Sequence, residues 1–175
     1  MKKITFIIAI ATLLIACTQP QQKLRKNISE KEKELFGDST MIPDKQKSAE
    51  LVKLYIEFAD QFQDDTSSAE YLFRAGDLSN SMRQHTKAID YFGRVQRYQA
   101  YRKAPAALFL QGFISETELH DMNKAKEYYE TFLVKYPQDE LSDDVRLSLR
   151  NLGKTPEEMI REFEAAQKGD SVAVK

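Results

Sequence analysis

The sequence lacks the residues on which most active sites and cross-links depend. In 175 residues it has no tryptophan, one cysteine (Cys17), two histidines (His85 and His120) and few glycines and prolines. A single cysteine excludes a disulfide within the chain, and neither an HExxH nor a GxSxG motif is present. We therefore expect no catalytic residues, no cofactor and no metal site, and we interpret both histidines as solvated loop residues.

The sequence also lacks an excess of charge of one sign. Its net charge is −1, although 30% of its residues are charged. This balance excludes the strong positive field that nucleic-acid binding requires, so we expect no nucleic-acid partner. A high charged fraction with little glycine and proline instead suits exposed amphipathic helices.

Only one long apolar run is present, at the start of the chain. Lys2 and Lys3 precede an apolar stretch from Ile4 to Ala16 that is interrupted only by Thr5 and Thr12. The run is shorter than the ~20 apolar residues that cross a bilayer. Positive residues followed by a short apolar run and small residues are typical of a secretory signal, so we expect residues 1–16 to be a signal peptide.

The end of this run, Leu14-Ile15-Ala16-Cys17, resembles the lipobox of bacterial lipoproteins. The resemblance implies that Cys17 becomes the first mature residue and carries the lipid, so that the membrane is a partner. Thr18 stands where an Asp would retain enteric lipoproteins in the inner membrane, and no acidic surface-export run follows. We expect outer-membrane anchoring that faces the periplasm. The alternative is an ordinary secretion signal with an incidental thiol.

Residues 17–42 are expected to hold the lipidated cysteine, a polar tether and a short helix. Thr18–Asn27 is polar and predicts a flexible tether. Its Lys23, Arg25 and Lys26 are either solvated or rest on anionic headgroups. Ser29–Glu32 is a capping-box pattern that predicts a short helix ended by Gly37.

From residue 43 onward, apolar residues recur at spacings of three and four, which predicts helices. No segment alternates with period two, so the chain is predicted to be all-α. We expect a helical domain over residues 43–167 and a C-terminal tail over 168–175. The expected helices span about 43–63, begin near 67, span about 85–98, begin at 105, span about 122–136, pass through 145–152 and begin at 155.

The helices repeat. Tyr71–Gly76 reappears as Ala107–Gly112, shifted by 36 residues, and Ala88-x3-Phe92 reappears as Ala125-x3-Tyr129, shifted by 37, and as Met159-x3-Phe163, shifted by 34. A helix-pair repeat near 34 residues is typical of tetratricopeptide (TPR) proteins. The small residues at these positions allow close helix packing. The chain resembles the TPR family over about residues 45–167, which implies a solenoid of about three helix pairs plus a leading helix.

With the lipobox, the chain resembles bacterial TPR lipoproteins, and its repeats are similar to those of the β-barrel assembly lipoprotein and Tol-Pal coordinator families. The resemblance implies a groove lined by the first helix of each pair. Aromatic and acidic residues there suit a peptide with basic residues, although the phenylalanines could instead fill gaps between helices. The groove residues would be Phe73, Asp77, Asn80, Phe109, Phe113, Glu116, Asp144, Ser148 and Asn151.

Two further charged features need an interpretation. Arg94, Arg97, Arg102 and Lys103, with Tyr98 and Tyr101, form a basic patch that is either solvated or faces an acidic partner. Asp64-Asp65 and Asp143-Asp144 lie at predicted helix starts, where carboxylates cap free N–H groups.

We expect a non-enzymatic, lipid-anchored periplasmic scaffold that binds an envelope protein or peptide during outer-membrane assembly, secretion or envelope maintenance. The alternative is a lipoprotein that binds a soluble ligand or cell-wall fragment.

Overall fold

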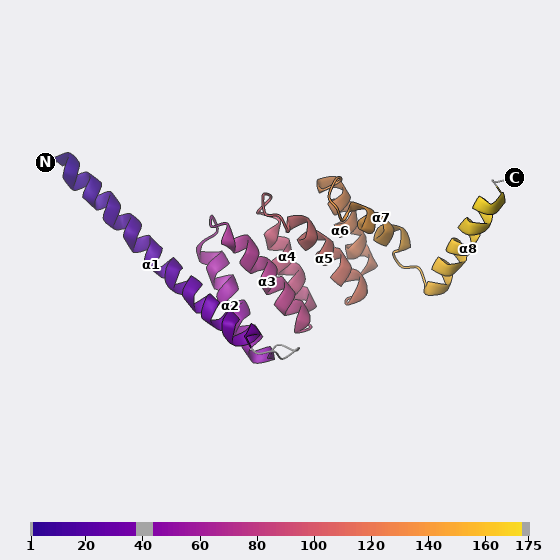
Figure 1. Cartoon of the computed structure of the whole chain (residues 1–175), viewed down its shortest axis with the longest axis horizontal. Helices are drawn as coiled ribbons and strands as arrows, with labels where there is room; N and C mark the ends of the chain where they lie inside the picture. Colours follow the sequence, from indigo (N-terminus) through magenta and orange to yellow (C-terminus); the bar gives the residue numbers. More distant parts are fainter. Residues whose placement is uncertain (1, 38–43, 173–175) are drawn as a thin grey trace. The chain divides into compact units, whose positions relative to one another are not determined.

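The computed structural model describes residues 2–37 and 44–172, with side chains described for 19–37, 44–162 and 164–165. Over these residues the fold is all-α, as predicted, with no strand (Figure 1). The helices are α1 (Lys2–Phe36), α2 (Lys45–Gln61), α3 (Ser67–Ser81), α4 (His85–Val95), α5 (Ala104–Thr117), α6 (Met122–Lys135), α7 (Ser142–Asn151) and α8 (Pro156–Val172).

The helix ends follow local chemistry. Asp44 caps α2 by accepting a hydrogen bond from the Lys47 N–H at 2.8 Å, and Asp121 caps α6 by accepting from Lys124 N–H at 3.0 Å. Before α8, the Thr155 hydroxyl accepts from the Glu158 N–H (3.2 Å) and the Glu158 carboxylate accepts from the Thr155 N–H (2.8 Å). This reciprocal pair forms a capping box at the helix start that the sequence places near residue 155.

The prediction of a flexible tether over residues 18–27 is wrong. This segment belongs to α1, which runs without interruption from Lys2 to Phe36, so the Ser29–Glu32 pattern does not open a separate helix. Leu24, Ile28 and Leu35 lie on one face of α1 and are at most 7% exposed. The polar residues between them conceal this sparse apolar stripe, whose burial against α2 offsets the cost of ordering the segment.

Other expected boundaries have different outcomes. Gly37 follows the last residue of α1, as predicted. The backbone of α8 continues from the expected repeat domain into the expected tail and ends at Val172. Three segments lie outside the described residues: residue 1, residues 38–43 and residues 173–175. The expected boundary between the short helix and the repeat domain falls in the second of these.

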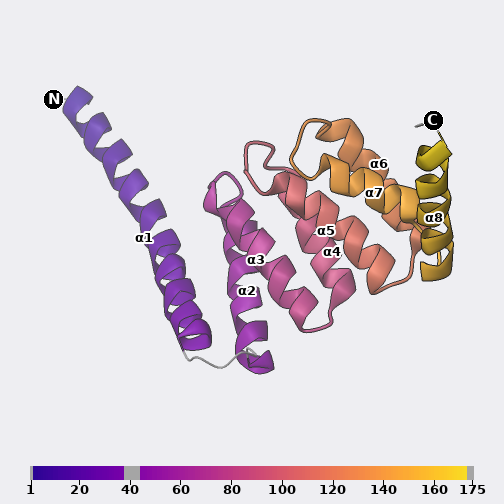
Figure 2. The same ribbon diagram turned by 45° about the vertical axis from the view of Figure 1, so that its right-hand side comes forward.

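The chain divides into two compact units, residues 1–107 and 108–175. In the first unit α1 packs on α2, α2 on α3 and α3 on α4, as Figure 2 shows. Its core combines apolar side chains from α1, α2 and α3: Leu24, Ile28, Leu35, Leu51, Val52, Tyr55, Phe58, Ala75 and Leu78. In the second unit α6 packs on α7 around Leu108, Ala125, Tyr129, Phe132 and Val145.

One packing device recurs in both units. A Cβ atom on Gly76 would lie 2.6 Å from the Phe92 ring, and a Cβ atom on Gly112 would lie 2.5 Å from the Tyr129 ring. Each glycine therefore lets an aromatic ring on the following helix contact its backbone. Ala88 and Ala125, which the repeat pattern marks as tight positions, are fully buried.

The loops between helix pairs also recur. The Ser68 hydroxyl donates to the Phe62 carbonyl (2.6 Å), and the Ser142 hydroxyl donates to the Tyr136 carbonyl (2.8 Å). In the same loops a side-chain oxygen of Asp65 accepts from Ser67 N–H at 2.7 Å, and one of Asp139 accepts from Leu141 N–H at 3.0 Å. Equivalent loop hydrogen bonds show that the repeated sequence forms repeated local structure.

Candidate functional site

A cavity of about 420 Å³ opens within the first unit where α1, α2 and α3 meet. It is lined by Phe36, Tyr55, Arg74, Asp77, Leu78 and Ser81, and we call it the α1–α3 cavity. Phe36, at the end of α1, is 56% exposed. An exposed aromatic ring beside charged groups is a common composition of ligand and peptide sites.

A network of hydrogen bonds fixes the charged wall of the cavity. The Glu32 carboxylate accepts from the Tyr55 hydroxyl at 2.7 Å and from the Arg74 guanidinium at 2.5 Å. Arg74 also donates to Glu70 at 2.7 Å, and Glu70 in turn accepts from the Tyr101 hydroxyl. Burial, followed by the bond to Glu32, raises the pKa of Tyr55 above its ordinary value, so this hydroxyl stays a donor. The Arg74 charge is thus already matched by two carboxylates.

Asp77 differs from its neighbours because no hydrogen bond or ion pair to its side chain is found within the described residues. Asp77 is exposed to solvent on one side, but partial desolvation by the surrounding protein raises the pKa of its carboxyl from 3.8 to about 6. Lys103 opposes this rise and Glu70 adds to it. The three carboxylates of Glu32, Glu70 and Asp77 exceed the two cations, Arg74 and Lys103, by one charge. A cationic ligand group would therefore compensate Asp77.

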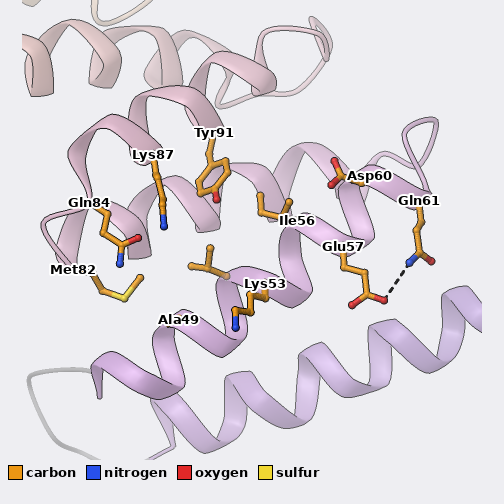
Figure 3. A pocket seen from close by; sticks show the side chains of 11 residues that line it. Ala49, Lys53, Ile56, Glu57, Asp60, Gln61, Met82, Gln84, Lys87 and Tyr91 are labelled. Atoms are coloured by element: carbon orange, nitrogen blue, oxygen red, sulfur yellow. Dashed lines mark hydrogen bonds between the residues drawn. The ribbon is translucent and has the colours of Figure 1, made fainter.

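A second cavity, of about 550 Å³, lies between α2 and α4 (Figure 3). Val52, Ile56, Met82 and Tyr91 supply its apolar lining, and Lys53, Lys87, Glu57 and Asp60 supply charges. Glu57 already accepts from Gln61 at 3.1 Å and Asp60 from Arg94 at 2.5 Å. The charged lining of this cavity therefore holds both signs, two lysines and two acids.

The predicted groove residues of the first unit separate in the structure. Phe73 is buried, at 8% exposed, so its assignment to an open groove is wrong. Its ring packs against Phe92, with centroids 5.4 Å apart, and the Lys103 ammonium lies 4.8 Å from its centroid. Asn80 is bonded to His85, with Oδ1 2.9 Å from Nδ1. Only Asp77 of these three lines the α1–α3 cavity.

Three of the predicted residues of the second unit, Phe109, Glu116 and Ser148, meet at Tyr129. Phe109 packs against the rings of Tyr129 (centroids 6.1 Å apart) and Phe113 (6.0 Å). The Tyr129 hydroxyl donates to Glu116 at 2.7 Å and is also hydrogen-bonded to Ser148. Phe113 is 44% exposed. Asp144, in the first turn of α7, is exposed, and Asn151 is half-buried at its end.

The predicted basic patch is not a continuous free surface. Arg94 pairs with Asp60 at 2.5 Å and Lys103 pairs with Glu70 at 3.5 Å. Arg97 and Arg102 are exposed, and no ion pair to either is found in the part of the chain that the structure describes. Sequence spacing groups these four cations, but the carboxylates that neutralise two of them come from distant positions.

The remaining predicted positions have structural roles or lie outside the described side chains. Asp65 caps the Ser67 N–H, as expected, whereas Asp143 pairs with Arg146 at 2.7 Å. Within the described residues, no three His, Cys, Asp or Glu side chains are grouped as metal ligands, and none of the helices is both long and apolar enough to span a bilayer. Cys17 belongs to α1, and the structure does not describe its side chain.

Sequence reasoning missed Glu32, Phe36, Tyr55 and Arg74 as members of a site. The only signal was local: Arg74 follows Glu70 by four residues and precedes Asp77 by three, which places all three on one helix face. The contribution of α1 was hidden by its interpretation as a tether. The chain matches no protein-family model and no curated protein.

Proposed function

We propose that this protein is a lipid-anchored periplasmic scaffold of the bacterial outer membrane, built as a TPR-like solenoid. In this proposal Cys17 carries the lipid, and the face that holds the α1–α3 cavity binds an envelope protein or peptide with basic residues. The process it serves is outer-membrane assembly, secretion or envelope maintenance.

The recurrence of helix-pair packing supports a repeat architecture of this kind. Gly76 against Phe92 and Gly112 against Tyr129 are equivalent contacts one repeat apart, and the Ser68 and Ser142 loop bonds are equivalent two repeats apart. Repeats of this type bury a continuous core and leave the first-helix side chains available to a partner. The lipobox supports the anchor.

The observation that carries the binding proposal is the Asp77 carboxylate, which pairs with no described residue and lines the α1–α3 cavity with Phe36, Tyr55 and Leu78. A lysine or arginine of a partner would place its alkyl stem on the aromatic and aliphatic wall and its charge on Asp77. In the second unit, the exposed ring of Phe113 offers a further apolar surface for a partner's side chain.

The test is crosslinking in membranes followed by purification and identification of bound proteins. Asp77→Lys should abolish capture by repulsion, and Phe113→Ala should weaken it. The matched controls are Asp90→Lys, an equal charge change at an exposed position of α4, and Val134→Ala, at an 81% exposed apolar residue of α6. Equal capture by Asp77→Lys and Asp90→Lys would refute the α1–α3 cavity as the binding site.

A cell-wall ligand predicts a different result. If purified muropeptides bind to the protein with measurable heat and no envelope protein is crosslinked, the soluble-ligand alternative replaces the scaffold. Metabolic labelling with palmitate tests the anchor separately, because Cys17→Ala should abolish the label whatever the partner is.

A further inference from the structure

The part of α1 that directly follows the expected lipid site is hydrogen-bonded to the loop between α2 and α3. Gln21 donates to the Asp65 carboxylate at 2.5 Å, and Arg25 donates to Asp65 at 2.6 Å and to the Ser67 hydroxyl at 2.8 Å. The Arg25 guanidinium also lies 4.7 Å from the centroid of the Phe58 ring. These contacts hold the 19–28 part of α1 against the loop between α2 and α3.

Only four residue steps separate Cys17 from Gln21, which is the first of the described α1 side chains to bond to that loop. As a helix these four steps span roughly 6 Å, and fully extended they span at most ~14 Å. The limit holds for any conformation of the intervening chain. A bilayer that holds Cys17 therefore lies within about 14 Å of Gln21, close to the loop that Asp65 belongs to.

The loop between α4 and α5 lies beside the loop between α2 and α3. The Tyr98 hydroxyl donates to the Gln63 carbonyl at 2.9 Å, and Arg94 pairs with Asp60 at 2.5 Å. We call these two loops, with residues 19–26 of α1, the loop end of the first unit.

The exposed charge of the loop end is mainly positive. Lys23, Lys26, Arg97 and Arg102 are exposed there, and among the described residues only Lys26 of these four forms an ion pair, at 3.8 Å to Glu30. The acidic residues Asp60 and Asp65 are neutralised by Arg94 and Arg25, which leaves Asp64 as an exposed acid of the two loops.

We propose that the loop end of the first unit lies on the membrane that holds Cys17, with Lys23, Lys26, Arg97 and Arg102 against anionic lipid headgroups. This inference rests on the lipid anchor of the proposed function. Each basic side chain near an anionic surface strengthens association about fivefold, within a Debye length of ~8–10 Å. As part of α1 the link spans roughly 6 Å, which brings the loop end to this range and holds the anchored protein in one orientation.

The absence of tryptophan makes the test direct. A single tryptophan is introduced as Gln99→Trp, in the exposed loop between α4 and α5, or as Thr86→Trp, in the exposed first turn of α4. The α4 helix of 11 residues separates the two probes by roughly 15 Å. The lipoprotein, purified from membranes, is reconstituted into vesicles of phosphatidylcholine with or without phosphatidylglycerol. Quenching by a headgroup spin-labelled lipid is then measured, and flotation of the vesicles reports anchoring.

We expect the probe at 99 to be quenched strongly and the probe at 86 weakly in phosphatidylglycerol vesicles. Adding Arg97→Ala and Arg102→Ala, or raising the salt to screen the charges, should reduce quenching at 99 while flotation is unchanged. Flotation with equal quenching at 99 and 86 would refute this inference and leave the anchor intact. Strong quenching at 99 without phosphatidylglycerol, insensitive to the arginine changes, would refute headgroup charge as the cause. Loss of flotation would refute both the anchor and this inference.

Discussion

Gly76→Ala is the sharpest test of the packing that joins α3 to α4. The added Cβ would lie 2.6, 2.7 and 2.8 Å from three atoms of the Phe92 ring. Carbon atoms at optimal separation are ~3.5–4.0 Å apart, so the ring would have to move by about 1 Å. It has no room, because Phe92 is 1% exposed and packs edge-on against Phe73.

Two terms set the size of the effect. Overpacking a core costs about 1–3 kcal/mol, and three contacts this short place Gly76→Ala near the upper end. Alanine also gains about 1 kcal/mol over glycine in a helix interior. The net expected loss is therefore about 2 kcal/mol of unfolding free energy, whereas the same change at an uncrowded helical glycine would stabilise the protein.

Urea unfolding followed by circular dichroism at 222 nm measures this loss. A lower transition midpoint with an unchanged slope against urea identifies a change in stability alone. In a Phe92→Leu background the same alanine should cost less, because leucine lacks the outer ring atoms that the Cβ meets. Thr131→Ala, at an exposed position of α6, is the control for helix propensity. A Gly76→Ala protein as stable as wild type would show that this contact is absent.

Three further predictions use other parts of the structure. Ala88→Leu and Ala125→Leu should each lower stability by about 1–3 kcal/mol, because both positions are fully buried; denaturant melts that match wild type for both would refute the repeat register. Leu24→Ala should lower stability by about 2 kcal/mol or more, whereas the neighbouring exposed Lys23→Ala should be neutral; equal melts for the two would restore the flexible tether. Asp77→Asn should stabilise the protein at pH 7 but not at pH 4. The pKa of the Asp77 carboxyl is about 6 in the folded protein and 3.8 without the fold, so the folded state binds more protons between these pH values. Stability is therefore lost as the pH rises through this window, and the asparagine, which does not ionise, avoids the loss. Thermal melts at both pH values measure the difference, and a constant difference would contradict the raised pKa.

Sequence reasoning also predicts that Phe113→Ala combined with Glu116→Lys leaves the fold intact, and the structure changes that expectation. Glu116 accepts the hydroxyl bond of the fully buried Tyr129, so its replacement by lysine would leave this hydroxyl without its acceptor. Phe113→Ala alone is the cleaner probe of the exposed surface.

The sequence by itself determined the elements of the repeat. Apolar spacing predicted α2 to α8 to within a few residues, because a helix that buries one face must repeat its apolar residues every three or four positions. The small residues Gly76, Gly112, Ala88 and Ala125 predicted close helix packing, because only such residues leave space for a neighbouring ring or backbone. The helix start at residue 155 was equally local, since the Thr155 and Glu158 groups that cap it lie within four residues.

Only the tertiary structure decided which residues form the α1–α3 cavity and which charged side chains are paired. The 18–27 segment is polar enough to be soluble as a coil, and it becomes a packed helix because Asp65, Ser67 and the Phe58 ring, distant in sequence, receive its Arg25. Likewise, Asp60 and Glu70 neutralise Arg94 and Lys103 of the predicted patch, while no residue that the structure describes pairs with Asp77. Spacing along a chain specifies which face a side chain occupies. The burial and the opposite charges that set its chemistry come from elements that meet it in space.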